Sequence, residues 1–232
     1  MSTDGPRPSR RAFRTVTALL VMLVLFNIAG ALWYVNRPRP VKPTALDRQN
    51  ARTELFLRMR PDSNAIIFLG DSHTEYFPLQ EIFPGLPVVN RGVSSSTSAQ
   101  VLARAIGSCG PAPSMIFIQA GINDLFQRIP VDGFEASMTD LLDTLHATFP
   151  EARIVLQSLL PTMDAGMDPD VRRCNEVLVR LAAERDLAYV DLYPTFASGD
   201  IIDEALTYDG VHLTAAGYFK WAEMIRPLLP QE

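Results

Sequence analysis

Beyond residue 45, short apolar runs of strand length alternate with longer stretches of helical periodicity. The strand-like runs are Ile66–Leu69, Leu86–Val89, Met115–Ala120, Arg153–Ser158 and Ala188–Leu192. The helical patterns are Leu46–Arg60, Thr97–Ile106, Phe134–Phe149, Asp170–Arg185 and Thr214–Leu229, and Leu55, Phe56 and Met59 are expected to form the buried side of the first. This alternation is typical of βαβ units, in which helices cover both faces of a parallel sheet. The pattern predicts one three-layer α/β domain over residues 46–232.

The N-terminal part of the chain has a different pattern. A basic tail, residues 1–14, precedes residues 15–35, which contain no charged side chain. As a helix, this segment would be roughly 30 Å long, which matches the hydrocarbon core of a bilayer. Residues 36–45 contain three prolines and predict a stiff, extended spacer. We therefore expect a transmembrane segment. An uncleaved anchor is favoured over a signal peptide cut near Ala29-Gly30-Ala31, because Leu32 to Val35 continue the apolar run.

The orientation of this segment follows from the charges beside it. Four arginines precede it and three basic residues follow it, so the positive-inside rule slightly favours a cytoplasmic N-terminus. Ser9-Arg10-Arg11 also resembles part of a twin-arginine export signal. The expected location of the domain is therefore the extracytoplasmic (periplasmic) side of the membrane.

Charge and cysteine content bear on the partners and metal sites that the chain could have. Residues after Lys42 contain 14 basic and 25 acidic side chains, so nucleic acid would be repelled and is not an expected partner. Cys109 and Cys174 are the two cysteines, and their spacing fits no metal site. They are either buried thiols or one disulfide, and a small core residue is the favoured interpretation for Cys174.

Gly70-Asp71-Ser72 ends the first predicted strand and could deliver a serine nucleophile, or it could simply cap a helix. A nucleophilic serine needs a base, and the chain has three histidines. His146 is expected on a helix surface, and the side chain of His73 would point away from its neighbour Ser72. His212 is the best candidate, and Asp209 could orient its imidazole, although the Asp209–Thr214 segment could equally be a turn and helix cap.

Two further segments could supply hydrogen-bond donors to an oxyanion. Gly121-Ile122-Asn123-Asp124 follows the third strand, and Asn123 offers a side-chain amide. Gly92 follows the second strand and offers an unhindered backbone N–H. Taken singly, each is more often part of a turn.

Together, these four segments resemble, in order and approximate spacing, the four sequence blocks of the SGNH (or GDSL) hydrolase family. The resemblance covers roughly residues 64–228 and implies a flavodoxin-like fold and serine ester hydrolysis without metal or organic cofactor. It assigns Ser72 as nucleophile, His212 as base and Asp209 as the residue that orients it. The Ser72 and Gly92 N–H groups and the Asn123 side chain would form the oxyanion hole. His73 departs from the aliphatic residue of many relatives, and the second block is little more than its glycine.

The resulting hypothesis is an exported, membrane-anchored esterase that cleaves small acyl esters, such as O-acetyl groups of envelope glycans or acyl lipids. One alternative is an acyltransferase that passes the acyl group from Ser72 to a sugar hydroxyl. Another is a non-catalytic module that uses the same cleft to bind a glycan.

Overall fold

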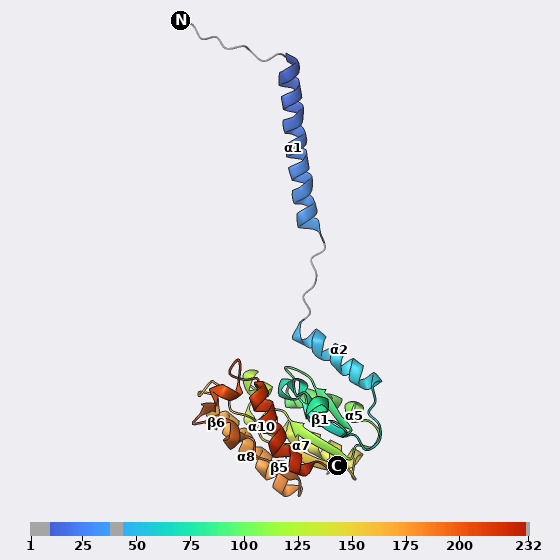
Figure 1. Ribbon diagram of the computed structural model, residues 1–232, viewed down its shortest axis with the longest axis vertical. Coiled ribbons are helices and arrows are strands. Elements are labelled where there is room, and N and C mark those ends of the chain that lie inside the picture. Colours follow the sequence, from blue (N-terminus) through green and yellow to red (C-terminus); the bar gives the residue numbers. More distant parts are fainter. Residues whose placement is uncertain (1–9, 38–43, 231–232) are drawn as a thin grey trace. The chain divides into compact units, whose positions relative to one another are not determined.

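The computed structural model describes residues 10–37 and 44–230, and its chain divides into two units, Met1–Lys42 and Pro43–Glu232 (Figure 1). Most of the predicted basic tail (1–14) and most of the predicted spacer (36–45) lie outside the described residues.

The described residues of the first unit form one helix, α1 (Arg10–Asn36). Within it, Arg14–Asn36 has a mean hydropathy of 2.3 and is long enough to cross a membrane. Large apolar side chains such as Phe26 and Trp33 are 78% and 67% exposed, so the described chain leaves this surface uncovered. The helix therefore has the length and composition of either a membrane anchor or a signal sequence.

The second unit is built on a five-stranded parallel sheet with the strand order β2-β1-β3-β4-β5. Its strands are β1 (Ile66–Gly70), β2 (Val88–Gly92), β3 (Met115–Gln119), β4 (Arg153–Gln157) and β5 (Ala188–Val190). Side chains alternate between the faces: Ile67 and Leu69 join one apolar cluster, whereas Ile66 and Phe68 join the other. The predicted α/β fold with a parallel sheet is confirmed.

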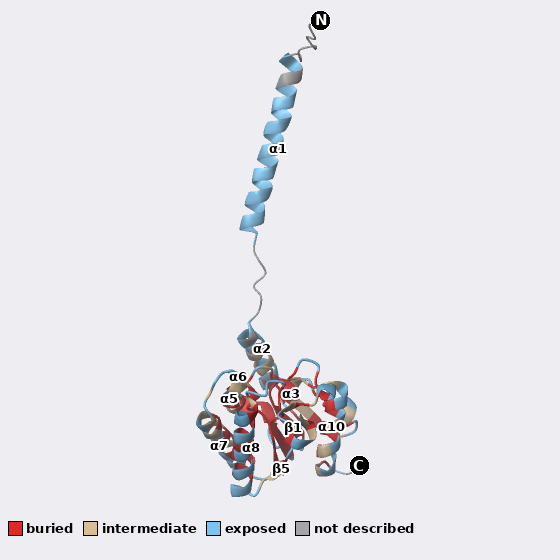
Figure 2. Ribbon diagram, turned by 90° about the vertical axis from the view of Figure 1, so that its left-hand side faces the viewer, coloured by how far each residue is buried: buried red, intermediate tan, exposed pale blue. Residues whose placement is uncertain are grey.

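Helices cover both faces of this sheet. Figure 2 shows α5 (Ser98–Cys109), α7 (Val131–Thr148) and α8 (Asp168–Glu184) on one side and α10 (Ala215–Ile225) on the other. The remaining helical segments are α2 (Ala45–Arg58), α3 (Ser72–Glu75), α4 (Leu79–Ile82), α6 (Ile122–Phe126), α9 (Tyr193–Phe196) and the 3₁₀ turns η1 (Glu204–Leu206) and η2 (Arg226–Leu228). A short antiparallel pair, β6 (Ala197–Ser198) and β7 (Ile201–Ile202), lies outside the main sheet.

Two details of the sequence-based prediction were wrong. In α2, Phe56 is buried as expected, but Leu55 and Met59 are 49% and 56% exposed. The helix packs through a narrow strip, in which the Phe56 ring lies between two guanidinium groups, 4.9 Å from that of Arg52 and 4.6 Å from that of Arg91. The second strand begins at Val88 and continues through polar residues to Gly92. As an edge strand, β2 tolerates polar side chains that an apolar run does not reveal.

Both cysteines are free, buried thiols on helices of the same apolar cluster. Burial raises the pKa of Cys109 and of Cys174 to about 12, so neither thiol ionises near neutral pH. This confirms the interpretation of Cys174 as a small core residue, and of the two alternatives for the pair the structure shows buried thiols.

Gly92 allows β2 to approach α3 very closely, which leads to a prediction about stability. A Cβ at residue 92 would lie 2.1 Å from the backbone nitrogen of Glu75. Gly92→Ala should therefore lower the free energy of unfolding by about 1–3 kcal/mol, because backbone must move to admit the methyl group. Chemical denaturation followed by circular dichroism measures this change.

Gly133→Ala is the matched control, since the nearest atom to its added methyl group is a flexible side-chain carbon of Ile129 at 3.1 Å. This change should be neutral or slightly stabilising, because alanine favours a helix over glycine. Equal losses in the two variants would contradict the packing argument.

Candidate active site

Ser72 stands where β1 ends and α3 begins, at the carboxyl edge of the sheet. The turn is tight, because a Cβ at Gly70 would lie 2.2 Å from the carbonyl oxygen of Gln119 on β3. Asp71 caps α3 by accepting a hydrogen bond from the His73 N–H at 3.0 Å. The serine is thus held at a fixed point of the sheet edge and is 5% exposed.

The structure brings His212 and Asp209 to this serine from the loop between η1 and α10. His212 Nε2 lies 3.0 Å from Ser72 Oγ, and His212 Nδ1 lies 2.7 Å from Asp209 Oδ2. A carboxylate only accepts hydrogen bonds, so Nδ1 carries the imidazole proton and Nε2 accepts from the serine hydroxyl. The order of contacts, carboxylate to imidazole to hydroxyl, is that of a Ser-His-Asp triad.

Asp209 is held in its charged form by hydrogen bonds. Its second oxygen accepts from the backbone N–H groups of Val211 at 3.0 Å and His212 at 2.7 Å. Burial alone would raise the pKa of Asp209, but the hydrogen bonds from the His212 side chain and from these two N–H groups outweigh it and lower the pKa below its usual value. The carboxylate can therefore orient the imidazole at neutral pH.

Asn123 and Gly92, the other predicted oxyanion donors, are in different situations. Asn123 lies on α6 and donates one amide hydrogen to the Ser96 carbonyl oxygen at 3.1 Å, which fixes its side chain and leaves a second hydrogen for another acceptor. The Gly92 N–H instead donates to Asn90 Oδ1 at 2.9 Å. The structure thus explains the glycine by its close approach to α3, and its N–H is already engaged.

His73 has a role that sequence reasoning missed. It is 1% exposed, and its Nε2 lies 2.8 Å from the carbonyl oxygen of Val211, the residue before His212. Since a carbonyl only accepts, Nε2 carries a proton and donates it to this bond. His73 therefore ties the loop of Asp209 and His212 to α3, although the two partners are 138 positions apart in sequence. His146, by contrast, is exposed on α7, as expected.

A buried carboxyl group lies next to His73. His73 Nδ1 is 3.7 Å from Asp71 Oδ1, and complete burial raises the pKa of Asp71 despite the nearby charges of His73 and Arg104. Arg104 donates to the Gly70 carbonyl oxygen at 2.5 Å, so a cation also supports the turn. These groups form a polar support beneath Ser72.

Two tyrosines flank His212 on its exposed side. The ring centroids of Tyr76 and Tyr208 are 5.3 Å and 6.0 Å from that of the imidazole, and the two side chains are 47% and 64% exposed. Among the described residues, no group of three or more His, Cys, Asp or Glu side chains could hold a metal ion.

Comparison with known proteins agrees with the fold. The model of the GDSL-like Lipase/Acylhydrolase family matches residues 68–219, about two thirds of the chain. The chain belongs to this family. No curated protein sequence matches it significantly.

Several solved structures have the same fold as this chain. A Streptococcus pneumoniae protein, provisionally described as a platelet activating factor, superposes with a TM-score of 0.75 at 23% identity, covering 80% of this chain and 94% of its own. A GDSL-like lipase from Bacteroides thetaiotaomicron gives 0.67 at 20% identity, with 78% and 96% covered. An acetylxylan esterase from Geobacillus stearothermophilus gives 0.61 at 22% identity, with 75% and 98% covered.

The contact between His73 and Val211 generates a prediction about this site. His73→Leu should lower kcat by about tenfold, because the loop that positions His212 loses a buried hydrogen bond of order 1 kcal/mol and gains freedom to move. His73→Gln should retain most of the activity, since its amide can donate to the same carbonyl oxygen. Steady-state kinetics with 4-nitrophenyl acetate measures both variants.

His73→Gln, which keeps a hydrogen-bond donor, is the control for His73→Leu, which has none. Wild-type activity in His73→Leu would show that the Val211 contact does not position the base. Equal loss in both variants, with intact thermal unfolding, would mean that the imidazole itself is needed for something other than this hydrogen bond.

Proposed function

We propose that this chain is an ester hydrolase in which Ser72 is the nucleophile, His212 the general base and Asp209 the residue that orients it. The observation that carries the proposal is the contact series from Asp209 through His212 to Ser72, at 2.7 Å and 3.0 Å, at the sheet edge of a GDSL-family fold. A helix cap alone would not require the histidine to reach the serine hydroxyl.

The reaction takes place in two halves. As Ser72 Oγ attacks the ester carbonyl carbon, His212 Nε2 accepts the hydroxyl proton and then delivers it to the leaving alcohol oxygen, which yields the alcohol and an acyl-serine. A water molecule then attacks the acyl carbon, again giving a proton to Nε2, and Ser72 recovers its proton when the acid leaves. Asp209 stabilises the imidazolium that forms in each half.

The oxyanion that develops in each half needs hydrogen-bond donors at its oxygen. We assign this role to the Ser72 backbone N–H and to the amide hydrogen of Asn123 that does not bind Ser96. Gly92 can join them only by exchanging its bond to Asn90 for the substrate oxygen.

We further propose short acyl esters of glycans as substrates, O-acetyl groups in particular. Acetylxylan esterases among the structural neighbours support a carbohydrate ester, and the two tyrosines beside His212 offer ring faces and hydroxyl groups that suit a sugar. Transfer of the acyl group to a sugar hydroxyl would use the same acyl-serine, so hydrolysis is distinguished from transfer by measuring free acetate against acetylated product.

We also propose that α1 anchors the chain and places the domain, residues 46–232, on the extracytoplasmic side. The supporting features are the exposed apolar surface of Arg14–Asn36, the arginines before it and the proline-containing segment after it. The substrate would then be an ester of the cell envelope, and the membrane is the partner of residues 15–35.

Ser72→Ala should reduce hydrolysis of 4-nitrophenyl acetate by about 10⁴-fold or more while leaving thermal unfolding unchanged, because it removes the nucleophile and one small hydroxyl. A fluorophosphonate probe should label the wild type and not the variant.

His212→Ala should lower the rate of hydrolysis by a similar factor, and the double variant should lose no more activity than either single variant, since the residues act as a unit. Residual activity of more than a few per cent in Ser72→Ala would contradict the acyl-serine mechanism.

Full-length protein should sediment with membranes, and protease added to intact spheroplasts should degrade the domain, because α1 holds it on the outer side. Immunoblotting against the C-terminus follows the digestion, and a cytoplasmic protein that survives until lysis is the control for intact membranes. Protection of the domain until the membrane is permeabilised would place it in the cytoplasm. Recovery in the soluble fraction would indicate a cleaved signal.

A further inference from the structure

A cavity opens beside the candidate active site, between α2 and the loop that follows β2. It has a volume of about 260 Å³, and its walls come from Arg48, Gln49 and Arg52 of α2 and from Tyr76, Ser94 and Ser95. Of the described residues that line it, Val93 alone is aliphatic. Residues far apart in the sequence thus meet at the carboxyl ends of the first two strands and enclose a small space lined mostly by polar residues.

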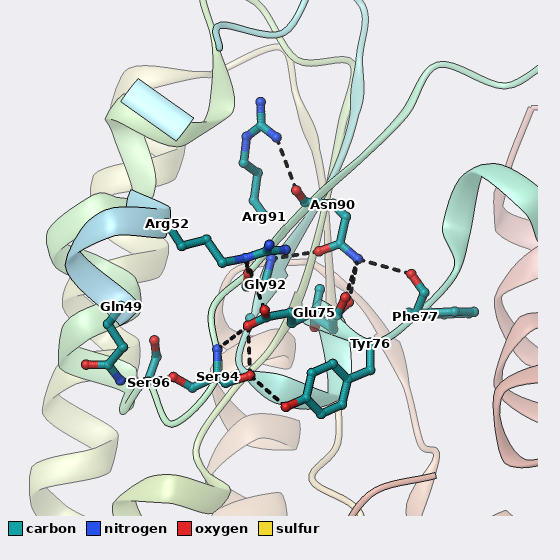
Figure 3. Close-up of polar contacts among 12 residues, drawn as sticks. Gln49, Arg52, Glu75, Tyr76, Phe77, Asn90, Arg91, Gly92, Ser94 and Ser96 are labelled. Atoms are coloured by element: carbon teal, nitrogen blue, oxygen red, sulfur yellow. Dashed lines mark hydrogen bonds and ion pairs between the residues drawn. The ribbon is translucent and has the colours of Figure 1, made fainter. Parts of the chain in front are cut away.

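The floor of this cavity is held by one network of polar contacts (Figure 3). Arg52 Nε donates to the Gly92 carbonyl oxygen at 2.7 Å and lies 3.5 Å from Glu75 Oε1. The other Glu75 oxygen accepts from both the backbone N–H and the hydroxyl of Ser94, at 2.6 Å and 2.7 Å. Because Glu75 is bonded on both oxygens, the walls are fixed before any ligand enters.

Tyr76 connects this network to the base. Its hydroxyl lies 3.2 Å from Ser94 Oγ at the cavity, and its ring centroid lies 5.3 Å from that of His212. In ester hydrolysis the base delivers its proton to the leaving alcohol, so the alcohol departs from beside the imidazole. A cavity on the Tyr76 side of His212 is therefore placed to take the alcohol part of an ester.

The lining indicates what kind of alcohol fits. Guanidinium, amide, carboxylate, serine and phenol groups offer both donors and acceptors, and Val93 and the Tyr76 ring add an apolar surface that is small for a long hydrocarbon chain. The volume is somewhat below the roughly 300–1,000 Å³ of sites for drug-sized ligands, which suits a single ring. An aromatic side chain at the entrance, Tyr76, presents an apolar face as well as a hydroxyl, as a sugar ring requires.

We propose that this cavity binds the alcohol moiety of the substrate, a sugar ring whose free hydroxyls bond to Gln49, Tyr76 and Ser95. This inference rests on the proposed esterase function and adds to it the site that binds the sugar and the residues that recognise it. Selectivity for sugar esters then comes from α2 and the loop after β2, and not from the residues that perform the reaction.

The test compares two esters that share an acetyl group: acetylated xylobiose and 4-nitrophenyl acetate, whose leaving group has no sugar hydroxyls. The measured quantity is the ratio of kcat/KM for the sugar ester to that for the nitrophenyl ester. Tyr76→Phe should lower this ratio about two- to tenfold, the loss expected for one hydrogen bond. Ser95→Asn should lower it by about tenfold or more, because a larger side chain enters the cavity. Asparagine tolerates the left-handed backbone of residue 95, whose φ is 62°.

Tyr208→Phe is the matched control, since Tyr208 also lies against His212 but does not line the cavity. It should leave the ratio within twofold of the wild type. Unchanged ratios in both Tyr76→Phe and Ser95→Asn, or a wild type that cleaves the nitrophenyl ester but not the sugar ester, would overturn the sugar subsite and leave the esterase proposal standing. A wild type inactive on both esters would instead remove the proposed function.

Discussion

The close approach of three chain segments at the carboxyl edge of the sheet is the constraint on which the site depends. Gly70 pairs with Gly92 on one side and with Gln119 on the other, and the space for a Cβ at either glycine is already filled by backbone. Because neither strand end can shift without a clash, the turn that follows β1 has one position. The Ser72 hydroxyl is thereby held in one position, which is what the proposed role of a nucleophile requires.

The loop that contains Asp209 and His212 is fixed by different means, since these residues belong to no strand. Three successive carbonyl groups of this loop each accept a hydrogen bond. The Gly210 carbonyl accepts from the Met163 N–H at 2.7 Å, the Val211 carbonyl from His73 at 2.8 Å, and the His212 carbonyl from the Thr207 hydroxyl at 2.7 Å. Three partners, Met163, His73 and Thr207, thus hold a short loop whose side chains remain partly exposed. Rigidity here comes from hydrogen bonds, whereas around Ser72 it comes from packing.

This difference between packing and hydrogen bonding explains which parts of the fold and of the candidate site could be predicted from the sequence. Buried parallel strands are apolar runs, so β1 and β3 were visible, and with three histidines the partner of Ser72 could be sought by elimination. The bond from Gly92 to Asn90 depends on a side-chain conformation, and the bond from His73 to Val211 joins residues 138 positions apart. Neither leaves a periodic or compositional signal. The exposure of Leu55 and Met59 was missed for a related reason, because an amphipathic pattern does not tell how wide a strip the domain covers.

The position of α2 in the chain links these features to the N-terminal segment. The helix begins at Ala45, directly after the proline-containing residues, and its capping box at Thr44 and Asp47 gives it a defined start there. The same helix packs Phe56 against Arg91 and supplies Arg48, Gln49 and Arg52 to the cavity. The first helix of the domain, α2, is therefore also one wall of the cavity beside His212. A soluble fragment that began at β1 would retain Ser72, His212 and Asp209 but lose this wall, so its activity on a small ester would not report the selectivity of the whole chain.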